Sequence, residues 1–227
     1  AYLSDGTLVN MNLPRFEPGQ FGKAVMVEDE TTNLVQNPTF ASTSNWQLAT
    51  DGTGTFSVLN NWGKINIPQG ETGKYYYLLQ EIVTTVPAGT KVTFSLVFKN
   101  NIAGTCAMRV VLFSGSVVVA EPVSNVVLDG SGIPKRHFMT VVYNTADCNK
   151  VRVDIMTGSY YPGLSDISIE FTKAQLEAKP YATSFIDGTR AAETLTIPTA
   201  GVLNPQEGTV ECWVYVNDII KRTDGVP

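Results

Sequence analysis

Apolar and polar residues alternate along much of the chain. The clearest alternation covers residues 92–98, 106–112, 151–155 and 167–171. Successive side chains of a strand point to opposite faces, so this period of two predicts half-buried β-strands. We expect the buried positions of these strands to include Val92, Phe94, Leu96, Val110, Val153, Ile167 and Ile169.

Further strands are predicted between turns rich in glycine and proline. These candidate strands are residues 23–27, 55–59, 62–67, 75–86, 116–120, 137–143, 183–186, 193–197 and 209–217. The turns between strands include "DGTG" at 51–54, "VPAG" at 86–89 and "DGSG" at 129–132. No segment has a convincing helical period, and a parallel sheet would need crossover helices. The sequence therefore predicts an all-β fold, an antiparallel β-sandwich.

The two ends of the chain differ in pattern from its middle. The regular strands fill about residues 31–187, which we expect to form one domain. Residues 1–30 contain one short strand-like run, and residues 188–227 restart with "TLTIPTAGVLNPQEGTVECWVYV" and end in "KRTDGVP", which is not typical of a natural domain end. We expect both flanks to belong to a second, incomplete sandwich that the central domain interrupts.

Composition and charge exclude several classes of function. With 227 residues and 43% hydrophobic content, the chain can bury a sizeable core. A net charge of −5 gives no general attraction for phosphate backbones, so we expect no nucleic-acid partner. The apolar runs are too short to cross a membrane, so we expect no membrane insertion. No signal peptide opens the chain, although a mature or excised piece would lack one, so export stays open.

The sequence carries no recognisable catalytic constellation. His137 is the single histidine, which excludes a multi-histidine metal site and makes a histidine relay improbable. No nucleophile elbow, phosphate loop or zinc-protease motif is present. The strand carboxylates could form a glycosidase pair on paper, but we expect solvated outward positions for Glu81, Asp154, Asp166 and Glu170. We therefore expect that the chain is not an enzyme.

Metal and disulfide signals are equally weak. The wide spacing of Cys106, Cys148 and Cys212 fits neither a metal knuckle nor a disulfide framework. Buried free thiols are the favoured interpretation, and a Cys106–Cys148 bridge stays open. The "DGTGT" and "DGSG" stretches lack the further carboxylates of a calcium loop, so we interpret them as hairpin turns and predict no metal ligands.

The aromatic residues are more informative. Three consecutive tyrosines, Tyr75 to Tyr77, open a predicted strand, so at least one must face away from the core. Trp46, Trp62 and Tyr160 lie in or beside predicted loops. Any single one could plug the end of a sandwich core. Together they favour a surface for sugars, whose hydroxyl groups would bond to polar neighbours.

Three stretches resemble the opening, middle and closing strands of jelly-roll carbohydrate-binding modules. They are "TTNLVQNPTFASTSNWQ" (31–47), "YYYLLQEIVTTVPAGTKVTFSLVFK" (75–99) and "ISIEFTKAQLEAKPYATSFI" (167–186). In the first, the matching residues are Asn33, Leu34, Asn37, Pro38, Phe40 and Trp46. In the last, they are Gln175, Leu176, Glu177, Tyr181, Ala182 and Ser184.

The closing motif and both flanks are also similar to bacteriophage tail and fibre proteins and to large surface proteins of Gram-positive bacteria. There the module is inserted in, or followed by, a laminin-G/concanavalin-like sandwich. The resemblance implies a virion or extracellular location, a polysaccharide or cell-surface glycan as partner, and a homo-oligomer if the protein is a fibre. Many relatives hold a structural calcium, but Ala41 and Thr172 replace two of the usual acids, so we expect no cofactor and leave calcium open.

The resemblance also implies a place for the ligand. It puts Tyr76, Leu78 and Ile82 in the core, and Tyr75 and Tyr77 on a concave outer face beside Glu81. The candidate ligand-binding residues are Tyr75, Tyr77, Trp62, Tyr143 and Tyr160. The reverse register stays open, because Leu79 and Val83 share the second parity. Two functions follow: a non-catalytic glycan-binding module, or a structural spacer of a fibre or filament without a ligand.

Overall fold

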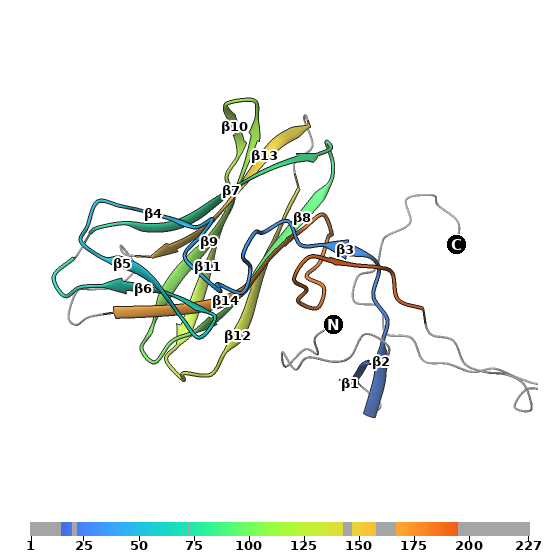
Figure 1. The fold of residues 1–227 in the computed structure, drawn as a ribbon, viewed down its shortest axis with the longest axis horizontal. Coiled ribbons are helices and arrows are strands. Elements are labelled where there is room, and N and C mark those ends of the chain that lie inside the picture. Colours follow the sequence, from blue (N-terminus) through green and yellow to red (C-terminus); the bar gives the residue numbers. More distant parts are fainter. Residues whose placement is uncertain (1–14, 20–21, 72, 143–146, 158–166, 195–227) are drawn as a thin grey trace, which may run out of the picture.

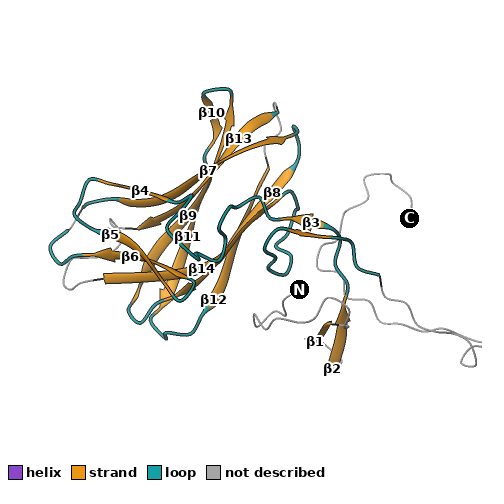
Figure 2. Ribbon diagram, in the orientation of Figure 1, coloured by secondary structure: helices purple, strands orange, loops and turns teal. Residues whose placement is uncertain are grey.

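The computed structural model describes residues 15–19, 22–71, 73–142, 147–157 and 167–194. These residues form strands, turns and loops, with no helix among them (Figure 1, Figure 2). Every strand pairing between them is antiparallel. The predicted all-β antiparallel class is therefore confirmed. Within this part of the chain, nothing has the length and apolar character of a membrane-crossing helix.

Two sheets make up the body of the molecule. The six-stranded sheet has the order β10 (Val117–Ala120), β9 (Ala103–Ser114), β13 (Cys148–Thr157), β7 (Tyr76–Val86) and β4 (Gln47–Thr50), with β11 (Val123–Asp129) also paired to β9. The five-stranded sheet has the order β12 (Lys135–Val142), β8 (Lys91–Lys99), β14 (Ile167–Glu177), β6 (Trp62–Ile67) and β5 (Thr55–Leu59). The chain crosses between the sheets at most connections, as in a jelly roll.

The core lies between these sheets and is built from the inward parity of each strand. Of the seven residues predicted to be buried, six are buried: Val92, Phe94, Leu96, Val110, Val153 and Ile169. The seventh, Ile167, lies in β14, but its side chain is outside the described residues. Each large apolar side chain removed from water in this way contributes about 1.5–3 kcal/mol to folding.

Two small sheets lie beside the sandwich. β1 (Arg15–Gly19) and β2 (Gly22–Met26) form a hairpin that extends away from it (Figure 1). β3 (Thr31–Thr32) pairs with β15 (Thr189–Arg190), so the two ends of the central domain lie side by side. Neither pair belongs to the main sheets.

The opening and closing stretches of the central domain meet through Asn33. Its buried amide donates to the carbonyl oxygens of Ala174 and Ile186 at 2.9 and 3.0 Å. Its carbonyl oxygen accepts from the backbone N–H groups of Val35 and Leu176, at 3.1 Å each. One side chain therefore satisfies four backbone groups of the opening and closing stretches.

Most predicted strands are confirmed, many of them within one or two residues at their ends. β9 and β13 begin three residues before the predicted alternation, and β14 continues six residues beyond it, to Glu177. Residues 183–186 are an exception, because they form no strand. The carboxylate of Glu177 accepts there from the Thr183 N–H and hydroxyl at 2.8 and 2.7 Å, which replaces a ladder. Residues 193–194 are not in a strand either, and residues 195–197 and 209–217 lie outside the described residues.

Two strands of the six-stranded sheet were not expected. β4 and β11 carry weak apolar patterns, and in β11 the polar pair Ser124 and Asn125 interrupts the alternation. Cys106 and Cys148 are both buried free thiols. The open possibility of a bridge between them is therefore excluded, and Cys212 lies outside the described residues.

Candidate functional site

The three consecutive tyrosines divide between the core and the surface. Tyr76 and Leu78 are fully buried, and Ile82 is nearly so, which confirms the predicted register of β7 and excludes the reverse one. Tyr75 and Tyr77 have the opposite parity and point to the outer side of the six-stranded sheet. Tyr75 is 38% exposed and Tyr77 is half-buried.

Tyr75 and Tyr77 form a pair of adjoining rings. Their centroids lie 5.0 Å apart and their planes are tilted by 37°. The backbone of Tyr75 is fixed on both sides, because its N–H donates to Asp51 Oδ1 at 2.8 Å and its carbonyl accepts from Thr50 Oγ1 at 2.6 Å. The pair is therefore held in place before any ligand arrives.

Arg109 of β9 covers part of Tyr77. Its guanidinium lies 5.1 Å from the Tyr77 ring centroid, at a distance typical of a cation–π contact. The same guanidinium donates to Asp154 Oδ2, with Nε at 2.6 Å and Nη2 at 2.5 Å. Tyr77 is thus packed against its neighbours, and Tyr75 offers the more accessible ring.

Asp154 does not have the solvated position expected from its outward parity. It lies on the outer face of β13 but is fully buried, because Arg109 and Arg152 flank it. Its Oδ1 lies 3.0 Å from Arg152 Nε. Burial raises the pKa of Asp154, and the two guanidinium groups act against that rise. Asp154 therefore positions two arginines and is not an accessible acid or base.

The outer face continues toward the far end of β9 with further cations. Lys150 Nζ lies 4.2 Å and the Arg152 guanidinium 5.8 Å from the ring of Phe113. Glu81 is exposed, as expected, and pairs with Lys150 at 3.2 Å. The face therefore combines aromatic rings with charged hydrogen-bond donors, and can hold a ring rich in hydroxyl groups.

The structure does not bring all five predicted ligand residues together. Tyr75 and Tyr77 lie side by side. Trp62 opens β6 in the five-stranded sheet, with the outward parity, so it lies on the opposite face of the sandwich. Tyr143 and Tyr160 lie outside the described residues.

Other residues considered from the sequence have structural roles. Trp46 is buried, stacks on Phe40 with ring centroids 4.9 Å apart, and donates from Nε1 to the Asn37 carbonyl at 3.3 Å. Glu170 is half-buried and pairs with Lys99 at 3.0 Å. Asp166 lies outside the described residues.

No metal centre is found among the described residues, where no three His, Cys, Asp or Glu side chains gather closely enough to hold an ion. Ala41 stands where relatives of the resembled modules carry an acid. Its N–H donates to Asn37 Oδ1 at 2.9 Å, so a side-chain amide closes this loop.

Sequence reasoning missed the positively charged part of the face. Arg109, Arg152 and Phe113 were not among the candidates. A signal was present, because Arg109 and Phe113 share the outward parity of their strand and Arg152 shares that of Asp154. What the sequence lacked was the pairing of β9 with β13, which sets Arg109 opposite Asp154.

The comparisons with known proteins concern only architecture. No protein-family model matches the chain, and no curated protein is detectably similar in sequence. The enzymatically active domain of tailspike protein 4 of bacteriophage CBA120 is similar in structure, with a TM-score of 0.49 and 16% identity over 64% of this chain. The chain spans only 21% of that domain.

Carbohydrate-binding modules are among the other similar structures. A CBM4 structure has a TM-score of 0.48 and 13% identity, over 63% of this chain and 99% of its own. TmCBM61 in complex with β-1,4-galactotriose has a TM-score of 0.47 and 14% identity, over 65% of this chain and 99% of its own. Similarity of this extent says nothing of a ligand, so the function must be argued from the side chains of this chain.

Proposed function

We propose that the central domain is a non-catalytic glycan-binding module whose site is the outer face of the six-stranded sheet around Tyr75 and Tyr77. The observation that carries this proposal is the pair of adjoining tyrosine rings, 5.0 Å apart, fixed on the surface by a buried Tyr76 between them. Its proposed setting, a phage tail or fibre protein or another extracellular surface protein, rests on the sequence resemblance described above.

The tyrosine rings would supply the main apolar contact with a sugar. One face of a pyranose is largely C–H, so it can pack against an exposed aromatic ring. The contact costs little side-chain entropy, because a tyrosine has few rotatable bonds. Tyr75 would supply the main contact because it is the more exposed ring. Tyr77, held under Arg109, would form the wall beside it.

The charged neighbours would then select the sugar. The guanidinium groups of Arg109 and Arg152 are oriented by Asp154, and Glu81 and Lys150 lie along the same face. Such groups can bond to hydroxyl and ring oxygens. The carboxylates of Asp154 and Glu81 are both engaged by cations, which argues against an acid and base pair and supports a binding role.

A single site of this kind is shallow, so we expect modest affinity. If the chain belongs to a fibre, repeating the site in a homo-oligomer would raise the overall avidity. A structural spacer of the same fold would carry the same rings without a ligand. The two functions differ in one measurable respect, which is whether the protein binds any glycan.

The test is a glycan array with the whole chain, followed by titration of a bound glycan. Tyr75→Ala should weaken binding about tenfold or more, and Tyr77→Ala by a smaller factor. Phe138→Ala is the matched control, because Phe138 is 60% exposed on β12 of the other sheet and should leave binding unchanged. A circular-dichroism spectrum checks that each variant folds.

Two outcomes would contradict the proposal. If Tyr75→Ala folds and binds its glycan as tightly as the unmodified protein, this face is not the site. If the unmodified protein binds no glycan on the array, the spacer function is favoured instead.

A further inference from the structure

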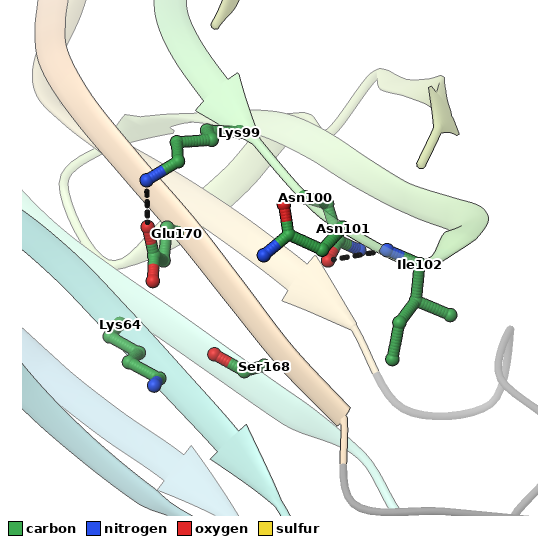
Figure 3. Close-up of a pocket in the computed structure, with 7 residues that line it drawn as sticks. All are labelled: Lys64, Lys99, Asn100, Asn101, Ile102, Ser168 and Glu170. Atoms are coloured by element: carbon green, nitrogen blue, oxygen red, sulfur yellow. Dashed lines mark hydrogen bonds and ion pairs between the residues drawn. The ribbon is translucent and has the colours of Figure 1, made fainter. Parts of the chain in front are cut away.

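A hollow lies on the outer face of the five-stranded sheet, on the other side of the sandwich from Tyr75 and Tyr77. Its volume is about 190 Å³, and Figure 3 shows the side chains around it. They come from β6, β14, the end of β8 and the loop after it, and the polar ones among them are Lys64, Ser168, Glu170, Lys99, Asn100 and Asn101. This is smaller than the about 300–1,000 Å³ of typical small-molecule sites, so it suits a single sugar unit.

The charges of the hollow are unbalanced. Lys64, Glu170 and Lys99 lie in one row across β6, β14 and β8, with the glutamate between the two lysines. Glu170 pairs with Lys99 at 3.0 Å. Lys64 is half-buried and has no ion pair or hydrogen bond in the described part of the chain. One ammonium group therefore faces the hollow without a counter-charge.

An aromatic ring stands next to this row. Trp62 precedes Lys64 by two residues, so it shares the outward face of β6, and it is half-buried. The ammonium of Lys99 lies 5.4 Å from its ring centroid. Trp62, which the sequence singled out and which lies on the opposite face from the tyrosine pair, is not among the side chains that line the hollow but stands next to Lys99, which does line it.

The loop after β8 supplies amide groups. The Asn100 carbonyl accepts from the Gly132 N–H at 2.9 Å, and Asn100 Oδ1 accepts from the Ile102 N–H at 3.3 Å, so the loop is held in a defined shape. Asn100 is 7% exposed, and its Nδ2 has no hydrogen-bond partner in the described structure. A buried donor without a partner is unfavourable, and an oxygen of a ligand in the hollow would satisfy it.

We propose that this hollow is a second saccharide site, specific for an acidic sugar unit that carries a carboxylate, such as a uronic acid in a polysaccharide. The carboxylate would bind Lys64, the hydroxyl groups of the same unit would bond to Asn100, Asn101 and Ser168, and the next sugar unit of the polysaccharide would lie against Trp62. The site shares no residue with the tyrosine face. It does not depend on the function proposed for that face, and the two can fail separately.

The experiment titrates the whole chain with oligomers of galacturonate, mannuronate and glucuronate, and with uncharged galactose oligomers of the same length, by NMR or calorimetry. We expect binding of at least one acidic oligomer that weakens as salt is added. Lys64→Ala should reduce its affinity about tenfold, because a charge-assisted hydrogen bond is lost. Trp62→Ala should also reduce it about tenfold, and Trp62→Phe serves if the alanine variant fails to fold.

Two controls separate this site from general effects. Lys91→Ala removes one exposed positive charge from β8 away from the hollow and should leave the affinity unchanged. Tyr75→Ala should also leave it unchanged, whatever its effect on other glycans. The proposal is overturned if no acidic oligomer binds at millimolar concentration. It is also overturned if Lys64→Ala and Lys91→Ala have equal effects, or if uncharged oligomers bind as tightly as acidic ones.

Discussion

The ring of Tyr76 lies directly against the backbone of Gly54, whose N–H donates to the Tyr76 hydroxyl oxygen at 3.3 Å. A Cβ atom at position 54 would overlap the tyrosine ring, and one at Gly52 would overlap its hydroxyl end. The two glycines of the "DGTG" turn therefore make room for the one tyrosine that enters the core. Through Tyr76, this turn also fixes the two outward tyrosines on either side.

Gly54→Ala should lower the free energy of unfolding by about 1–3 kcal/mol, because the added methyl group must displace a ring that the core holds in place. Urea unfolding of the variant measures this loss. The cost should be smaller by about 1 kcal/mol in a Tyr76→Leu background, where the ring is absent. Equal costs in the two backgrounds would show that the contact with Tyr76 is not the cause.

The register of β7 could be predicted from the sequence, whereas the position of Trp62 could not. Alternation places Tyr76 and Tyr77 on opposite faces but leaves both registers open, and the resemblance to carbohydrate-binding modules selects the correct one. It does not tell which of two sheets a strand joins. β6 and β7 are consecutive in the chain but lie in different sheets. Trp62 and Tyr77 therefore both point away from the core, but on opposite faces of the sandwich.

Asp154 shows a second limit of the same kind. Its parity is outward, and an outward carboxylate is normally solvated. Its burial is decided by Arg109, 45 residues earlier in the chain, which reaches it only because β9 pairs with β13. Pairing between strands far apart in the chain cannot be seen in the local sequence pattern. The candidate site predicted from the sequence therefore lacked Arg109 and Arg152.

Replacing Arg109 should make stability more dependent on pH. Burial raises the pKa of Asp154 and Arg109 lowers it, so Arg109→Met should raise that pKa further. When the pKa of a carboxyl group is higher in the folded than in the unfolded protein, the group stabilises the folded state most below its unfolded pKa of about 3.9. This stabilisation is lost as the pH rises through the pKa of the folded protein. The destabilisation caused by Arg109→Met should therefore be larger near about pH 7 than near about pH 4.

Urea unfolding at the two pH values measures this difference. Lys150→Met is the control, since it removes a cation whose partner, Glu81, is exposed, and should cost less than about 1 kcal/mol. An Arg109→Met loss that is the same at both pH values, or larger in acid, would contradict the role assigned to Arg109.

Cys106 should be chemically silent in the folded protein. Burial raises the pKa of its thiol to about 12, so the reactive thiolate is scarce and shielded. In a Cys212→Ser background, we expect a thiol reagent near about pH 8 to label neither remaining cysteine until denaturant is added, when both react. The raised pKa also means that stability contributed by Cys106 is complete below an ordinary thiol pKa of about 8.5 and is lost as pH rises toward the folded value.

Cys106→Ala provides the comparison for the alkaline range, because it removes the titrating group. The unmodified thiol should lose stability relative to this variant above about pH 9, by at most about 1.4 kcal/mol per pH unit. Rapid labelling of Cys106 in the folded protein would contradict its burial.

Several contacts tie the predicted central domain, residues 31–187, to residues just outside it. Arg190 and Glu28 form a mostly buried ion pair, with Nη1 and Oε2 2.9 Å apart, and Glu28 Oε1 accepts from the Ser184 N–H at 2.8 Å. Glu28 and Glu193 also bond to each other twice, from the Glu28 N–H to the Glu193 carboxylate at 2.8 Å and from the Glu193 N–H to the Glu28 carbonyl at 2.9 Å. The stretches that enter and leave the domain are therefore tied together.

A fragment of residues 28–193 should consequently be more stable than one of residues 31–187, by about 2–4 kcal/mol, since the shorter one loses the ion pair and leaves the Ser184 N–H without its acceptor. Arg190→Met in the longer fragment should reproduce much of that loss.

If the flanks belong to a second domain, as we propose, the sandwich in the whole chain should unfold with the same free energy as the 28–193 fragment. Urea unfolding of the two fragments, the Arg190→Met variant and the whole chain decides the matter. Equal stability of the two fragments would show that the ion pair does not close the domain, and a much more stable sandwich in the whole chain would show that the flanks are part of it.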